Sequence, residues 1–319
     1  MSCNDLSHCA QLLLQVLLIG ISNGAVIALI ALGYTLVYGI IEFINFAHGD
    51  LFMLGTMFSL TVVTTFGLRK STPGLQLALL LVVTLALAML FCATANVVIE
   101  RIAYRPLRSA PRLAPLISAI GVSFILINIG QYWNGASPVD FPNLLPNIDL
   151  ISDVMGIKGS TVSYSTKDLF VIALAVPLMA ALRLFVTRTR LGKAMRATAQ
   201  DREAAALMGI DINVTIALTF LIGGALAGSA GFIYGLYNNT AWFLQGFRGG
   251  LMAFTAAVFG GIGNLAGAFL GGMLIGIAAA FSDFFFDPRW TQAVVFALLI
   301  LTLVFRPAGI LGQTVREKV

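Results

Sequence analysis

The chain has 319 residues, of which 59% are hydrophobic and only 10% are charged. A soluble globular domain carries about 25% charged residues, so fourteen acids and nineteen bases are too few to cover a soluble surface of this size. These values exclude a cytosolic enzyme, a secreted module and a disordered chain. Because helices satisfy their own backbone hydrogen bonds in lipid, the composition predicts an all-α, polytopic membrane bundle. The net charge of +5 then indicates basic cytoplasmic loops and no nucleic-acid partner.

Apolar runs predict where the chain crosses the membrane, since a span needs roughly 20 apolar residues. Eight long runs predict spans at 10–32, 48–66, 75–99, 114–133, 168–186, 214–237, 267–283 and 291–305. Two shorter runs, 34–46 and 250–262, are bounded by glycine or polar residues and predict short or broken segments. We therefore expect a single transmembrane domain, with a first half at 10–112 and a second half at 214–312.

Loop charges predict the orientation, because Lys and Arg collect on the cytoplasmic side. The segments 101–112 and 183–213, together with the C-terminal tail, hold 13 of the 19 bases. They are expected inside, with 187–213 as the main cytoplasmic loop. The more acidic loop 134–167 is expected outside, as a cap or docking surface. Arg69 and Lys70 are an exception, because counting segments also places them outside. Counting all ten segments as crossings places the N-terminus inside.

The two halves show signs of an internal repeat. Leu-Ile-Gly at 18–20 recurs at 221–223, and Tyr34 recurs as Tyr237 at the same offset. Loop charge gives both halves the same orientation, so the pattern predicts a parallel repeat. Broken helices at matching places in two halves point to a transport path at their interface. The alternative is chance recurrence of Leu, Ile and Gly in a glycine-rich apolar chain.

Polar residues near the two short segments are the candidates for a solute path or gate: Glu42, Asn45, His48, Asp50 and Asn264. Ionisable groups at membrane depth are costly and usually functional, and a broken helix must turn its freed backbone groups toward protein or water. In the alternative, the first four form a cytoplasmic turn, with Asp50 stabilising the next helix start and His48 exposed. No metal site is expected, because one His and two acids supply too few ligands.

The cytoplasmic segment 192–211 predicts two short helices. Asp201 favours a helix start, and Gly209 suits the left-handed position after a helix end. By helical spacing, one face is shared by Ala197, Ala204, Ala205 and Met208. A small apolar face outside the membrane usually seeks a partner groove, although the helix could also fold back on its own bundle.

Seven stretches carry a resemblance to a known family, including Asn-Phe-Ala-His-Gly-Asp at 45–50 and Arg-Pro-Ala-Gly-Ile-Leu-Gly at 306–312. The stretches are 33–41, 44–50, 99–106, 116–121, 253–258, 260–263 and 306–312. They resemble the Liv-type H permease subunit of bacterial branched-chain amino acid ABC importers. Permeases for urea and short amides look similar at 45–50, so these cargoes stay open. An ion-coupled secondary amino acid transporter is a further alternative.

The resemblance implies a multi-pass protein of the bacterial inner membrane that is not an enzyme and holds no cofactor. Its partners would be a second homologous permease, two ATPase subunits that bind and hydrolyse ATP, a periplasmic substrate-binding protein and the lipid bilayer. The implied ATPase-coupling residues are Arg196, Asp201, Glu203, Ala205 and Gly209. The chain also lacks a phosphate-binding loop and hydrolase motifs. We expect the helix start near Asn45 and His48 to offer backbone N–H groups to a cargo carboxylate.

Overall fold

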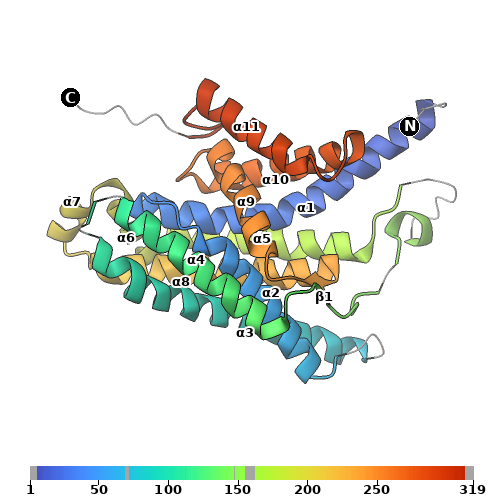
Figure 1. Ribbon diagram of the computed structural model, residues 1–319, viewed down its shortest axis with the longest axis horizontal. Helices are drawn as coiled ribbons and strands as arrows, with labels where there is room; N and C mark the ends of the chain where they lie inside the picture. The colour runs from blue at the N-terminus through green and yellow to red at the C-terminus, as the bar shows by residue number, and fades with distance from the viewer. Residues whose placement is uncertain are drawn as a thin grey trace.

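The computed structural model describes residues 6–68, 72–108, 110–111, 113–146, 148–154 and 162–312. Its regular structure is almost entirely helical, as Figure 1 shows. In chain order the elements are α1 (Leu6–Ile41), α2 (Ala47–Thr65), α3 (Gly74–Ile99), the π-helix η1 (Glu100–Tyr104), the 3-10 turn η2 (Arg105–Leu107), α4 (Leu113–Asn134), β1 (Val139–Asp140), the π-helix η3 (Leu150–Val154), α5 (Thr166–Arg188), α6 (Arg190–Gln200), α7 (Arg202–Leu207), α8 (Ile212–Asn238), β2 (Thr240–Ala241), α9 (Gln245–Gly260), α10 (Leu265–Phe285) and α11 (Thr291–Phe305). Arg69 and Lys70 lie outside the described residues.

Within the described ranges, six helices are long and apolar enough to cross a membrane: α1, α3, α4, α5, α8 and α10. This confirms the all-α polytopic class and six of the eight predicted spans. The runs 48–66 and 291–305 form α2 and α11, which do not meet the same criterion. The first turn of α2 carries His48 and Asp50, which lower its hydropathy, and α11 has only 15 residues.

The predicted short segment 34–46 does not exist as a separate element. The helix α1 continues through Gly33 for 36 residues and ends at Ile41. Glycine does not break this helix, because its backbone hydrogen bonds remain intact. Gly33 instead permits a close approach, since a Cβ there would collide with the imidazole of His48. The second short run, 250–262, falls largely within α9, and residues 261–264 form the turn into α10.

The contacts of α1 correct the predicted side of the N-terminus. Near its beginning, Gln15 Oε1 accepts a hydrogen bond from the backbone of Ser163, in the loop expected outside (2.7 Å). At its end, the Ile40 carbonyl accepts a hydrogen bond from Arg202, in the loop expected inside (2.6 Å). Thus α1 crosses once, from the outer to the inner end of the bundle. The start of α1 therefore lies at the end of the bundle that loop charge predicts to be outside, whereas counting ten crossings placed it at the other end.

The two halves are inverted, and the predicted parallel repeat is wrong. Gly33 of α1 lies opposite Gly223 of α8, where a Cβ would be 3.6 Å from the Gly33 carbonyl oxygen. Yet α8 starts after the basic loop and ends beside the outer loop, where Phe141 N donates to Asn239 O (3.0 Å), so it runs opposite to α1. Likewise α1 packs along α10, the third helix of the second half, and α8 packs along α3, the third of the first. Packing of the first helix of each half along the third helix of the other half is expected of two halves with inverted topology.

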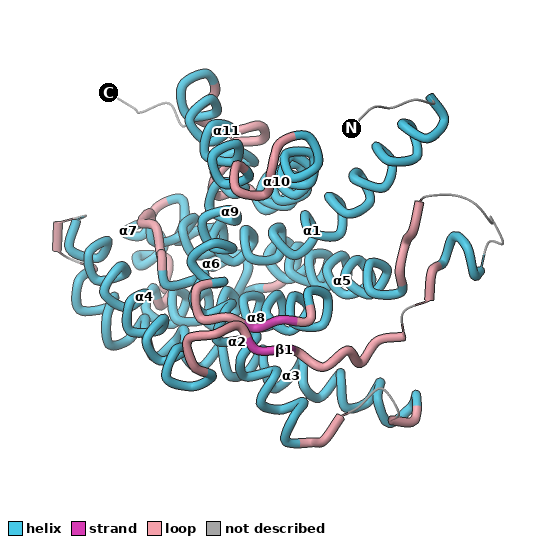
Figure 2. Tube along the Cα trace, turned by 45° about the vertical axis from the view of Figure 1, so that its right-hand side comes forward, coloured by secondary structure: helices cyan, strands magenta, loops and turns pink. Residues whose placement is uncertain are grey.

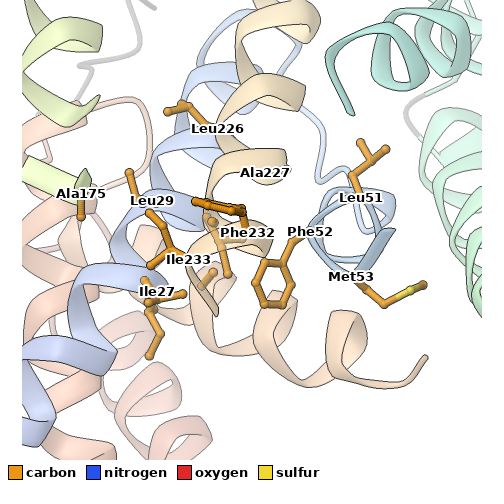
Figure 3. Close-up of a cluster of buried hydrophobic side chains, with 14 of the residues drawn as sticks. Ile27, Leu29, Leu51, Phe52, Met53, Ala175, Leu226, Ala227, Phe232 and Ile233 are labelled. Atoms are coloured by element: carbon orange, nitrogen blue, oxygen red, sulfur yellow. The ribbon is translucent and has the colours of Figure 1, made fainter. Parts of the chain in front are cut away.

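Small residues let these helices approach closely. A Cβ on Gly24 would lie 2.9 Å from the Cα of Met273 in α10, and one on Gly228 would meet the carbonyl oxygen of Ala88 in α3. Within lipid the hydrophobic effect does not drive helices together, so close van der Waals contacts of this kind stabilise their association. The core they enclose combines side chains of α1, α2 and α8, and Figure 3 shows Phe232 lying between Leu29 and Phe52.

The outer loop is tied to the bundle by a short antiparallel ribbon. Val139 of β1 pairs with Ala241 of β2, in the connection between α8 and α9. Figure 2 shows this strand pair, of which β2 also contacts α2 and α8. The adjoining Phe141 is buried against Gly235. The loop therefore packs onto the outer ends of the helices that carry the buried polar residues described next.

Candidate functional site

The first turn of α2 carries two of the predicted site residues into the protein interior. The backbone leaves α1 through Glu42, which has a positive φ of 58°, and re-enters a helix at Ala47. His48 is 0% exposed and Asp50 is 1% exposed. The expectation of an exposed His48 in a cytoplasmic turn is therefore wrong. Gly49 makes this burial possible, because a Cβ there would lie 2.5 Å from the Gly246 carbonyl oxygen of α9.

Asp50 is a buried acid with one of its two carboxyl oxygens hydrogen-bonded. Its Oδ2 accepts a hydrogen bond from the hydroxyl of Ser123 in α4 (2.5 Å), whereas Oδ1 has no hydrogen-bond partner. In the described part of the chain, no basic side chain forms an ion pair with it. It lies in the first turn of α2, where the sequence alternative placed it to stabilise the helix start.

His48 packs against α1. Its ring packs on Gly33 and meets the ring of Tyr34 edge-on, with the centroids 4.8 Å apart. Neither ring nitrogen makes a hydrogen bond of good geometry. Buried polar atoms without partners are rare and call for an explanation by strain, a water or a functional role.

A cavity of about 330 Å³ adjoins this cluster. Its lining is mainly apolar, and it includes two hydroxyl-bearing side chains and two glycines. The lining residues are Tyr34, Phe46, Ile120, Ser123, Phe124, Ile127, Gly246, Phe247, Gly250 and Leu251. Ser123, Tyr34 and Gly246 were missed by sequence reasoning. A lone serine or glycine in an apolar run carries no signal of its own.

Asn45 and Glu42 lie at the inner end of the bundle, away from this cavity. The Asn45 side-chain oxygen accepts a hydrogen bond from Tyr104 of the π-helix η1 (2.6 Å). Glu42 is exposed and lines a second cavity of about 230 Å³, together with the ion-paired Glu100 and Arg108. Burial lowers the pKa of the Arg108 guanidinium, and Glu100 opposes that shift. π-Helical turns often mark functional positions, and this one holds the start of α2 in place.

Asn264 is a helix cap and not part of the α2 cluster. Its Oδ1 accepts a hydrogen bond from Gly267 N (3.1 Å), and its Nδ2 donates to Leu311 O (2.8 Å). It thereby starts α10 and fastens the segment after α11. Asn264 lines a third cavity, of about 620 Å³, together with Arg183 and Arg196.

The basic loop forms the two short helices that the sequence predicts, α6 and α7. Asp201 caps α7 by accepting a hydrogen bond from Ala204 N (2.9 Å). Gly209 follows the helix end with a φ of 83°. Both positions are confirmed. Arg196 donates to the carbonyls of Val186 (3.0 Å) and Thr187 (3.3 Å), so it fixes α6 against the end of α5.

The predicted apolar face of this loop is wrong. Ala205 is only 4% exposed and packs against the bundle, whereas Ala204 and Glu203 are exposed. The extended backbone at Asp201 separates Ala197 from α7. Within α7, the neighbours Ala204 and Ala205 point about 100° apart around the helix, so one is exposed and the other is buried. The exposed apolar residues are instead the tip of α7, made of Leu207 and Met208, which are 88% and 82% exposed.

Comparison with known proteins shows the family of this chain. Residues 16–303 match the family described as the permease component of the branched-chain amino acid transport system. The chain is 43% identical over 308 residues to the high-affinity branched-chain amino acid transport system permease protein BraD of Pseudomonas aeruginosa, covering 96% of this chain and 98% of that protein. It is 40% identical over 307 residues to the corresponding protein LivH of Escherichia coli K12, covering 96% and 97%.

The chain belongs to this permease family. The resemblance drawn from its motifs is thereby confirmed, and it extends to nearly the whole chain. The protein is a multi-pass protein of the bacterial inner membrane. Its family consists of transport components and not of enzymes.

Proposed function

We propose that this chain is a permease subunit of an ATP-driven importer for branched-chain amino acids. Its relatives carry the names of permease proteins of high-affinity branched-chain amino acid transport systems. A second homologous permease, two ATPase subunits and a periplasmic binding protein complete the importer. ATP is bound and hydrolysed by the ATPase subunits, and this chain supplies part of the path.

The observation that carries the proposal is the cavity beside α2. A branched-chain amino acid combines an aliphatic side chain with a charged backbone. The wall formed by Phe124, Ile127 and Leu251 suits the aliphatic part, since burying each CH₂ group contributes about 0.8 kcal/mol. The hydroxyl of Ser123 and the carboxylate behind it provide polar atoms at one side of that wall. Few polar groups in a mostly apolar pocket are typical of small-molecule sites.

A mechanical connection from the tip of α7 to this cavity supports the proposal. Leu207 and Met208 project from the bundle and suit an apolar groove on an ATPase subunit. Arg202, at the start of α7, is bonded to the Ile40 carbonyl at the end of α1. The next residues lead directly into the first turn of α2. When the ATPase subunits close, movement of α7 therefore acts on the turn that precedes His48 and Asp50. The inverted halves can then rock to expose the cavity alternately to each side.

The test is reconstitution of the complete importer in liposomes. With ATP and the binding protein, the vesicles should accumulate leucine, and a proton uncoupler should leave the rate unchanged. Omitting either the ATPase subunits or the second permease should abolish accumulation. If this chain alone accumulated leucine when driven only by an ion gradient, the proposal would be refuted in favour of a secondary transporter.

A further inference from the structure

The starting point is a buried acid without a basic partner. Asp50 is 1% exposed within the bundle, and in the described residues it has one hydrogen bond, from Ser123, and no ion pair. Its second oxygen, Oδ1, has no hydrogen-bond partner. An acid at membrane depth is expensive unless a partner compensates it. A partner that donates a hydrogen bond and carries positive charge would compensate the ionised acid.

The carboxyl group of Asp50 lies behind the wall of the 330 Å³ cavity and is not part of its lining. Two of the residues that line the cavity are those that contact the carboxyl group. Ser123 donates to Oδ2, and Gly246 faces Oδ1, where a Cβ would lie 2.8 Å from that oxygen. Ser123 and Gly246 therefore separate the carboxyl group from the cavity.

The chemistry of this wall selects a primary ammonium group. An ammonium carries three N–H donors, and its hydrogen bond to a carboxylate is among the strong, charge-assisted kind. A divalent metal ion requires more oxygen or nitrogen ligands than one carboxylate and one hydroxyl, and the described residues contain no group of three His, Cys, Asp or Glu side chains that could hold one. A carboxylate is disfavoured, since Asp50 places a negative charge in the first turn of α2.

We propose that Asp50, held by Ser123, is the subsite that binds the α-ammonium group of the cargo as its aliphatic side chain passes along the cavity. This inference rests on the proposed function. It replaces the sequence expectation that the start of α2 binds the cargo carboxylate. It also restricts the cargo to molecules with a free ammonium group, so neutral amides and urea do not satisfy the site.

The first experiment compares the complete importer carrying Asp50→Asn with the unmodified importer in liposomes. We expect leucine uptake at subsaturating concentration to fall about 10- to 100-fold, the loss expected for a charge-assisted hydrogen bond. The ATPase rate stimulated by the loaded binding protein should be retained, because the α7 tip is unchanged. The matched control is Ser59→Ala, also in α2. Ser59 is fully buried and bonded only to its own helix, at Gly55 O (2.7 Å), so uptake should persist.

The two proposals fail in different ways. If the unmodified importer does not accumulate leucine, the proposed function fails. If it does, and Asp50→Asn transports leucine at the same rate, the ammonium subsite alone is overturned. A general loss caused by disturbing α2 would appear equally in Ser59→Ala, and that result would also overturn the subsite.

A second variant keeps the inference testable if Asp50→Asn does not assemble. Ser123→Cys is nearly isosteric and places a thiol beside the intact carboxylate. Relative to a free thiol in solution, we expect 2-aminoethyl methanethiosulfonate to react at least about tenfold faster than the anionic 2-sulfonatoethyl reagent, because Asp50 attracts the cation. The unmodified chain, whose Cys92 is buried, supplies the background rate. Equal relative rates for the two reagents would overturn the assignment.

Discussion

Replacing Gly209 by valine is expected to uncouple transport without preventing membrane insertion. Gly209 ends α7 in the left-handed region, with a φ of 83°. Its N–H donates to Ala206 O (3.0 Å), and the next residue, Ile210, donates to Ala205 O (3.1 Å). These two bonds close the helix directly behind the exposed tip at Leu207. The conformation of the tip therefore depends on a backbone shape that a β-branched residue rarely adopts.

The size of the effect follows from the surroundings of Gly209. No atom lies within 4 Å of where its Cβ would be, so the penalty is one of backbone strain and not of collision. That strain amounts to about 1–2 kcal/mol for an L-residue, and a penalty of this size changes a conformational population by about 5- to 30-fold. Because α7 has only six residues, few other contacts oppose the change. ATP-driven uptake should fall by about the same factor.

The assay is leucine uptake by the reconstituted importer, together with the ATPase rate stimulated by the binding protein. Gly209→Asn should retain most activity, because asparagine tolerates the left-handed region. Gly67→Val is a matched control at the outer end, since Gly67 has a φ of 61° and equally open surroundings. It should impose similar strain without uncoupling. Normal uptake by Gly209→Val, or equal inactivity of the Asn and Val variants, would refute the reasoning.

Three further substitutions test the connection and the packing. Leu207→Glu should leave the melting temperature unchanged, because the side chain is 88% exposed, but should lower the stimulated ATPase rate; a normal rate would exclude the α7 tip as the ATPase contact. Gly228→Leu should strongly reduce the amount of folded protein, since its side chain would meet the Ala88 backbone of α3; an unchanged melting temperature would contradict this packing. Tyr104→Phe removes the donor to Asn45 and should destabilise the protein by about 1–3 kcal/mol, measured as a lower melting temperature, with no change counting against that bond.

Much of the helical framework was predictable because lipid imposes a simple rule on sequence. A helix that crosses the membrane must be apolar over about 20 residues, and six runs that meet this rule are long helices in the structure. Helix ends in the basic loop were equally predictable from the sequence. Asp201 caps a helix and Gly209 adopts a left-handed conformation, since both outcomes depend on the residue and its near neighbours.

The relative direction of the two halves and the burial of the polar residues were not predictable from the same information. One apparent break, at Gly33, is a site of close packing for His48, and removing that break reverses the relation between the two halves. Likewise, Glu42, Asn45, His48 and Asp50 are adjacent in sequence but differ in environment, with Glu42 exposed and Asp50 buried.

The sequence by itself determined a lipid-embedded helical chain, its family, and the helix ends of its basic loop. Only the tertiary structure decided that the halves are inverted, that Ala205 faces inward while Leu207 faces outward, and that Asp50 meets Ser123 across 73 residues of chain. The physical reason is that hydropathy and capping act over a few residues. The partner of a buried charge depends instead on how closely helices far apart in sequence can approach one another.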